Sequence, residues 1–221
     1  MKIAIVSDVH GNLVALEAVL EDLETVQPDL VVHGGDLAWR GPRPAECVDR
    51  VREAGWPGVI GNMDRALETH RHEGSVGWTA ERLGPERNAW LQSQPMEWRQ
   101  EDQVALVHAV PGDLWQAVLP DADDAELRAV YGPLGARLAV YCHIHRPYVR
   151  EMGDLTVANT GSVGLPYDGD RRSSYLLVTD GRCENRRVAF DVERAVADVE
   201  TVGQPGAAKI ARIYRSAEPP P

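Results

Sequence analysis

Short apolar runs, most of them followed by a residue of metal-ligand type, constrain the fold of this chain more than any other feature. Apolar runs of about four to seven residues are typical of buried strands, and residues at the ends of parallel strands meet at one edge of a sheet. The seven positions are Asp8, His10, Asp36, Asn62, His108, His143 and His145. Two aspartates, one asparagine and four histidines in this arrangement predict a site for two metal ions.

The first 60 residues predict a parallel sheet with helices on its faces. Strands are expected over residues 2–7, 29–33 and 58–60. Asn12 can cap a helix in which leucines recur at steps of three and four residues, and a second helix is expected over residues 44–54.

The rest of the chain changes from alternating helices and strands to mostly strands. Two helical stretches are expected within residues 63–94, paired strands at 97–100 and 104–108, a helix at 121–131 and a strand at 138–141. Later strands at 148–151, 155–158, 175–178 and 182–190 favour a second sheet packed on the first, followed by a helix at 191–201. We expect one domain over residues 1–215 and a disordered tail at 216–221.

The charge of the chain limits its partners. The formal net charge is −11, so the overall field repels duplex nucleic acid and anionic membranes, and a phosphate-bearing substrate would need a local positive centre such as bound metal. No apolar stretch approaches the roughly 18 residues of a membrane span, and the N-terminus lacks the layout of a signal peptide. The three cysteines read as free thiols, so we expect a cytoplasmic protein. The sequence does not determine the oligomeric state.

The residue types also favour particular metals. Two adjacent divalent ions repel each other, so at least one carboxylate must bridge them, and Asp36 is placed for that role after two glycines. Asp8 and His10 can chelate one ion, whereas Asn62 and His108 can complete the shell of the other. A mixed set of oxygen and imidazole ligands fits Mn, Fe, Zn, Ni or Co better than Ca or Mg.

Three segments carry a resemblance to a known family. The metal-ligand motifs are similar to the D-x-H, G-D, G-N, H and G-H-x-H series of the calcineurin-like metallophosphoesterase superfamily. Residues 8–20, the loop 41–46 and the segment 159–166 resemble its small bacterial phosphodiesterase branch. The likeness runs from residue 2 to about 180.

This resemblance implies a fold and a reaction. The fold is an α/β four-layer αββα sandwich of two mixed β-sheets flanked by helices, with a dinuclear centre at the strand ends. The first metal would be bound by Asp8, His10, Asp36 and His145, and the second by Asp36, Asn62, His108 and His143. The nucleophile would be a metal-bridging hydroxide, on which Asp36, Asn62 and His108 act through the ions, with Mn the leading candidate.

The chain departs from the family pattern at three positions. Met63 stands where the family has a catalytic histidine, Cys142 replaces the glycine of G-H-x-H, and Thr160 replaces a proline. Because methionine cannot protonate a leaving group, Met63 favours phosphodiesters with good leaving groups over alkyl monoesters. Asp64 is expected to orient a ligand without touching the metal.

Alternatives remain open at the level of substrate and function. A phosphomonoesterase or a dinucleoside polyphosphate hydrolase would use the same metal site, and a nucleotide is among the candidate substrates. A different class of function is a non-catalytic scaffold, since a scaffold subunit of retromer resembles this family. No P-loop or G-x-S-x-G motif is present.

Candidate substrate-binding residues lie in two loops. Arg40 and Arg43 flank a Gly-Pro turn near Asp36, and Arg171 and Arg172 follow a Gly-rich loop. Each could bind phosphate, or each could be an ordinary solvated loop residue. The loop 161–164 is expected to hold the ligand loops in place rather than to cradle a phosphate.

Overall fold

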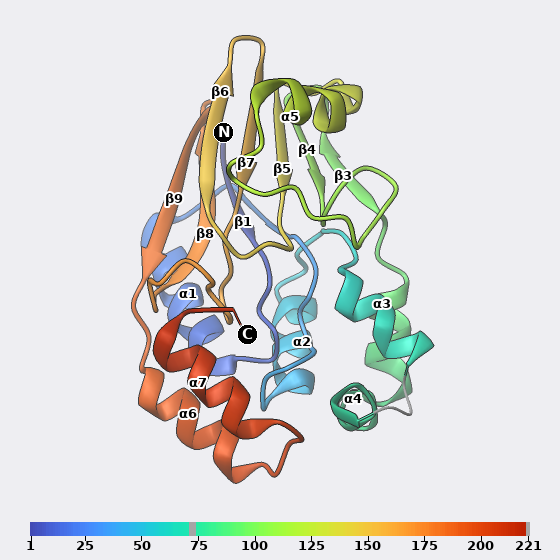
Figure 1. Cartoon of the computed structure of the whole chain (residues 1–221), viewed down its shortest axis with the longest axis vertical. Coiled ribbons are helices and arrows are strands. Elements are labelled where there is room, and N and C mark those ends of the chain that lie inside the picture. The colour runs from blue at the N-terminus through green and yellow to red at the C-terminus, as the bar shows by residue number, and fades with distance from the viewer. Residues whose placement is uncertain (71–73, 220–221) are drawn as a thin grey trace.

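The computed structural model describes residues 1–70 and 74–219 (Figure 1). Its first half contains β1 (Lys2–Val6), α1 (Leu13–Val26), β2 (Leu30–His33), α2 (Pro44–Glu53), α3 (Asn62–Thr69), α4 (Gly74–Gln92), β3 (Glu97–Gln100) and β4 (Val104–Val107). Its second half contains α5 (Asp124–Tyr131), the 3₁₀ turn η1 (Gly132–Leu134), β5 (Leu138–Tyr141), β6 (Tyr148–Met152), β7 (Leu155–Asn159), β8 (Ser173–Thr179), β9 (Arg182–Val188), α6 (Val192–Thr201) and α7 (Ala207–Ser216).

The strands form two mixed sheets. One has the order β2-β1-β8-β9 and the other β3-β4-β5-β7-β6. β1 and β2 are parallel, as are β4, β5 and β7, whereas β8, β9, β3 and β6 run antiparallel to their neighbours. The late strands therefore divide between the two sheets, because β8 and β9 extend the first sheet and β6 and β7 extend the second.

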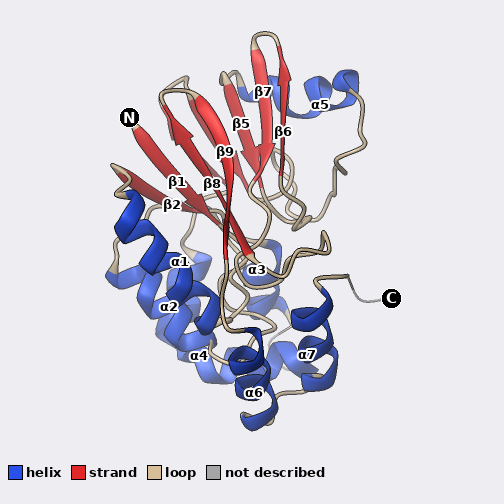
Figure 2. Ribbon diagram, turned by 90° about the vertical axis from the view of Figure 1, so that its left-hand side faces the viewer, coloured by secondary structure: helices blue, strands red, loops and turns tan. Residues whose placement is uncertain are grey.

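Alternating side chains on the strands build the layers. Ile3 and Ile5 of β1 pack between the two sheets with Val104 and Leu106 of β4. The intervening Ala4 and Val6 of β1 point outward into a cluster with residues of α1 and α2. The intervening residues of β4 face a separate cluster that includes Leu127 and Tyr131 of α5. The alternation, with period two, confirms the predicted αββα sandwich, and Figure 2 shows both groups of helices beside the strands.

Local sequence signals account for several boundaries. The Asn12 side chain accepts a hydrogen bond from the Ala15 amide at 3.2 Å, so the predicted cap of α1 is confirmed.

The third predicted strand, at residues 58–60, is wrong, because only a single bridge joins Gly58 to His33. The Val59 amide donates to the His33 carbonyl at 3.0 Å, but the Ile60 amide donates to the Pro95 carbonyl at 2.9 Å, so the pairing with β2 does not continue.

The C-terminal region holds one helix, α7, that was not predicted from the sequence. The helix predicted at 191–201 is α6, and α7 packs against it. Ser216, placed in the expected tail, is the last residue of α7, and Ala217 is fully buried. Residues 220 and 221 lie outside the described part of the chain. Among the described residues, no helix combines the length and apolar character needed to cross a membrane.

Candidate metal centre

The seven predicted positions converge where strands of both sheets end. Asp8 and His10 follow β1, Asp36 follows β2, His108 follows β4, and His143 and His145 follow β5. Asn62 is the first residue of α3. Because β1 and β2 are parallel, and β4 and β5 are parallel, their carboxyl ends point the same way and bring these loops together.

Five of the seven residues have a left-handed backbone. The φ angles are 55° at Asp8, 49° at His10, 51° at Asp36, 66° at His143 and 57° at His145. Such angles cost a non-glycine residue roughly 1–2 kcal/mol each and concentrate at functional sites. They end the extended strands and turn the chain, so that side chains after β1, β2 and β5 can meet.

Glycines allow the ligand loops to approach each other. A Cβ atom on Gly61 would lie 2.0 Å from Asp36 Oδ1 and 2.3 Å from the Asp36 amide nitrogen. Gly34 similarly leaves room for Cys142, whose Sγ would be 2.3 Å from a Cβ at Gly34. Gly34 thus provides the space for the Cys142 side chain, which stands where the family has a glycine. Burial raises the pKa of the Cys142 thiol, so it is not activated as a thiolate.

One group of candidate ligands is formed by Asp8, His10 and His145. The Nδ1 atoms of His10 and His145 lie 2.7 and 2.6 Å from the carbonyl oxygens of Trp39 and Leu165. Because a carbonyl can only accept, each Nδ1 carries the proton and donates it, which leaves each Nε2 of a neutral ring with a lone pair. The two Nε2 atoms are 3.1 Å apart, and that of His145 is 3.1 Å from Asp8 Oδ1.

Asp8 Oδ1 and the two Nε2 atoms are buried together, and none of the three carries a proton that it could donate in a hydrogen bond. Asp8 Oδ1 is buried and has no hydrogen-bond partner, although its Oδ2 accepts from the Ser7 hydroxyl at 2.7 Å. A single added proton could bridge only one of the close contacts among Asp8, His10 and His145. One divalent cation would satisfy all three atoms together, and carboxylate and imidazole are ligands suited to transition metals. The residues present therefore fit a metal ion.

A second group contains Asp36, Asn62, His108 and His143. His108 Nδ1 donates to the Gly34 carbonyl at 2.8 Å, and its Nε2 lies 2.9 Å from Asn62 Oδ1 and 3.6 Å from Asp36 Oδ2. His143 Nδ1 lies 3.2 Å from the same Asn62 oxygen. Asp36 Oδ2 is also 3.7 Å from His10 Nε2, so Asp36 lies between the two groups.

Burial and charge set the protonation of the cluster. Burial lowers the pKa of His10 and of His143 below 6.5, which favours the neutral rings that bind metals. Burial also opposes the charge on His108, yet Asp36 and Asp8 outweigh it and raise its pKa.

Met63 and Asp64 occupy the positions beside Asn62. The Met63 amide donates to Asp36 Oδ1 at 2.8 Å, and its Sδ accepts from Asn62 Nδ2 at 3.3 Å. Asp64 is buried and accepts from the Leu37 amide at 3.2 Å, one residue beyond Asp36. Burial, and then the charge of Asp36, raise the pKa of Asp64 to about 7.

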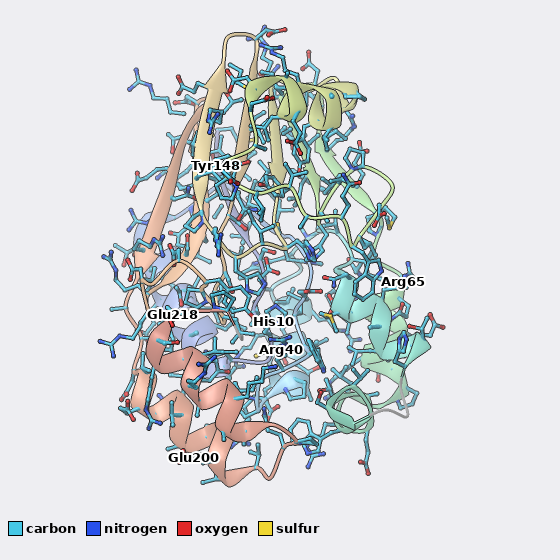
Figure 3. The ribbon with its side chains drawn as sticks, in the orientation of Figure 1. His10, Arg40, Arg65, Tyr148, Glu200 and Glu218 are labelled. Carbon is cyan, nitrogen blue, oxygen red and sulfur yellow. The ribbon has the colours of Figure 1, made fainter. Side chains whose placement is uncertain are left out.

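The four predicted substrate-binding arginines are not together. The Arg40 guanidinium stacks 4.5 Å from the Trp39 ring and donates to Tyr167 Oη at 3.1 Å. In Figure 3, Arg40 is labelled beside His10. The other three do not support the prediction. Arg43 is bound by the Asp198 carboxylate, and exposed Arg172 pairs with Asp170. Arg171 and Arg172 line a separate surface groove with residues 189–193.

Three contacts that fix the histidines were not predicted from the sequence. The Tyr167 ring stacks on His145 with centroids 4.4 Å apart, and the carbonyls of Trp39 and Leu165 orient His10 and His145. Backbone carbonyls give no sequence signal. The expected structural role of the loop 161–164 is confirmed, because Ser162 Oγ donates to the Asp8 carbonyl at 2.7 Å.

Comparisons with known proteins identify the family of the chain. The family model of the calcineurin-like phosphoesterase superfamily domain matches residues 1–182. An uncharacterized protein of Methanocaldococcus jannaschii is 30% identical, over 87% of this chain and 89% of that protein. The phosphodiesterase YfcE of Escherichia coli K12 is 26% identical, over 81% of this chain and 89% of that protein. The crystal structure of a metallophosphoesterase from Sphaerobacter thermophilus has a TM-score of 0.86 at 28% identity, covering 98% of this chain and 99% of that one. The chain therefore belongs to the calcineurin-like phosphoesterase superfamily.

Proposed function

We propose that this chain is a dinuclear metal-dependent phosphodiesterase. The observation that carries the proposal is the buried group of Asp8 Oδ1 and two imidazole Nε2 atoms, which face one another without a donor. Family membership supports a hydrolase of phosphate esters, and the name of the Escherichia coli relative supports a phosphodiesterase.

The residues would divide between two ions that share Asp36. One ion would be held by Asp8, His10, Asp36 and His145, and the other by Asp36, Asn62, His108 and His143. When bound, such ions lower the pKa of water to about 7 and neutralise charge on a phosphoryl group. The mixed ligands favour Mn, with Fe, Zn, Ni or Co as the other candidates.

The protein residues around the ions would orient this centre. His10 and His145 keep fixed tautomers because their Nδ1 protons are donated to carbonyls. Asp64 holds the Leu37 amide and so positions the loop of Asp36. Arg40 would orient the small-molecule phosphate ester, since its guanidinium is held at the edge of the site by Trp39 and Tyr167.

The identity of residue 63 favours substrates whose leaving group needs no proton. The Met63 thioether lies against the Asn62 amide, where a histidine would have been able to donate. Aryl diesters, phosphoanhydrides and cyclic nucleotides therefore suit the site better than alkyl monoesters. Within a series of diesters, kcat/KM is therefore expected to fall steeply as the pKa of the leaving alcohol rises.

The proposal is tested by elemental analysis followed by a hydrolysis assay. We expect purified protein to hold about two transition-metal ions per chain and to hydrolyse bis(p-nitrophenyl) phosphate when supplied with Mn. Asp36→Asn should lose both metal and activity, whereas Asp121→Asn, an exposed control, should retain both. Equal rates for wild type and Asp36→Asn would refute the proposal.

The scaffold alternative makes the opposite prediction. A protein that works without metal would leave Asp8 Oδ1 buried and unsatisfied, at a cost of about 1–3 kcal/mol. A stable partner recovered by pull-down from a metal-free, inactive protein would favour that alternative.

A further inference from the structure

Arg40 is a cation held without a carboxylate. It stacks on Trp39 and donates to Tyr167, and the ion pairs among the described residues do not include it. Its φ angle of 96° is unusual for a side-chain-bearing residue. Arg40 donates to Tyr167, and the Tyr167 ring stacks on His145, so a single residue links Arg40 to the ligand cluster.

The helices α6 and α7 support Arg40 from outside the family domain. The family model ends at residue 182, before either helix begins. Gln204, in the turn between them, donates from Nε2 to the Arg40 carbonyl at 2.7 Å. Asp198 of α6 binds Arg43, which anchors the other end of the same loop. In Figure 1, this pair of helices lies beside the lower end of the strands.

A small cavity separates α7 from the Arg40 loop. Its volume is about 130 Å³, and it is lined by Trp39, Arg40, Ser75, Pro205, Gly206 and Lys209, among others. This is about four times the ~30 Å³ occupied by one water molecule in the liquid. It is smaller than the 300–1,000 Å³ of pockets that take drug-sized ligands. The size suits a single phosphate group.

The lining is positive in a chain of net charge −11. Lys209, like Arg40, is absent from the ion pairs found in residues 1–70 and 74–219. The first turn of α7 contains no acidic residue, and no side chain caps it. Ser75 Oγ accepts from the Trp39 indole at 3.3 Å, which leaves the hydroxyl proton available to donate.

We propose that this cavity is a second anion subsite that binds a further phosphate group of the substrate. The substrate class is then an organic di- or polyphosphate, with one phosphate at the ligand cluster and another held by Arg40 and Lys209. The inference rests on the proposed function for the identity of the reaction, but the binding of an anion by the cavity does not depend on it.

The first test measures anion binding without metal. Inorganic pyrophosphate is titrated calorimetrically at low ionic strength into metal-free wild type, Lys209→Met, Lys209→Arg and Arg212→Met. We expect binding to weaken about tenfold in Lys209→Met, as for the loss of one hydrogen bond to a charged group. It should persist in Lys209→Arg. Arg212→Met is the matched control, because it removes an exposed charge from the same helix outside the cavity. Absent binding, or equal affinity in all four proteins, would overturn the subsite.

The second test compares two substrates in the Mn-loaded protein. For diadenosine tetraphosphate relative to bis(p-nitrophenyl) phosphate, the ratio of kcat/KM should fall about tenfold in Lys209→Met and stay unchanged in Arg212→Met. Hydrolysis of the aryl diester with an unchanged ratio would overturn the subsite and leave the proposed function intact. If neither substrate is hydrolysed, the proposed function fails, and the calorimetric result alone decides the subsite.

Discussion

Acidification is expected to destabilise this protein through His33, a histidine buried beneath the ligand loops. His33 is the last residue of β2, is 1% exposed, and has its ring centroid 5.7 Å from that of Trp90. Neither ring nitrogen has a hydrogen-bond partner, so a charge on the ring would be uncompensated. Burial accordingly lowers the pKa of His33 from 6.5 to about 4.

The pKa difference gives the direction and size of the effect. Above pH 6.5 the ring is neutral in both the native and the unfolded chain, so it adds no pH dependence. As the pH falls from 6.5 towards 4, the unfolded chain binds a proton that the native protein excludes, and the free energy of unfolding decreases. The loss attributable to His33 is about 2 kcal/mol at pH 5 and approaches about 3.4 kcal/mol below pH 4.

Urea unfolding between about pH 4.5 and 8 measures this effect in metal-free wild type and His33→Leu. Repacking around leucine adds a constant offset, so the informative quantity is the change with pH of the difference between the two proteins. Wild type should lose about 2 kcal/mol relative to His33→Leu between pH 7.5 and pH 5. His70→Leu, which removes an exposed histidine, is the control and should keep the wild-type profile. Parallel curves for wild type and His33→Leu would refute the reasoning.

Three further predictions concern the centre itself. Gly61→Ala should reduce metal content and lower kcat/KM by at least about tenfold, because its Cβ would lie 2.0 Å from Asp36 Oδ1, whereas Gly132→Ala, with nothing within 4 Å of its Cβ, should do neither. Tyr167→Phe removes the hydroxyl that accepts from Arg40 and keeps the stacked ring, so KM should rise about threefold to tenfold while elemental analysis finds unchanged metal. Mn at about 100 times its dissociation constant should raise the free energy of unfolding by about 2.7 kcal/mol, and chelator treatment in a urea titration should reverse the gain.

The apolar runs predicted the sheets because strand burial leaves a direct mark on the sequence. β1, for example, is apolar on both faces, since Ile3 and Ile5 pack between the sheets and Ala4 and Val6 pack under helices. The same runs located the ligand candidates, because a ligand at a strand end must be polar where the apolar run stops. These features depend on local sequence, so they could be predicted without the structure.

Features that depend on distant contacts could not be predicted in the same way. Arg43 resembles a phosphate-binding residue in sequence, but its partner Asp198 lies 155 residues later. The failed strand at residues 58–60 depends on Ile60, whose amide donates to the carbonyl of Pro95 and not to β2. The tautomers of His10 and His145 depend on carbonyl groups, which every residue carries, so no residue type marks them.

The left-handed backbone of the candidate ligands bears on how their loops are ordered. Five such residues cost roughly 5–10 kcal/mol together, which is comparable to the whole net stability of a domain. These backbone conformations persist because hydrogen bonds between the loops hold them in place. The His10 amide donates to the Asp36 carbonyl at 2.9 Å, and the Gly164 amide donates to the Asp8 carbonyl at 2.9 Å. Since these bonds join different strands and involve no ligand side chain, the sandwich itself orders the loops. Metal binding then needs no further ordering of the backbone, and the loss of one ligand side chain should weaken metal affinity far more than it alters the fold.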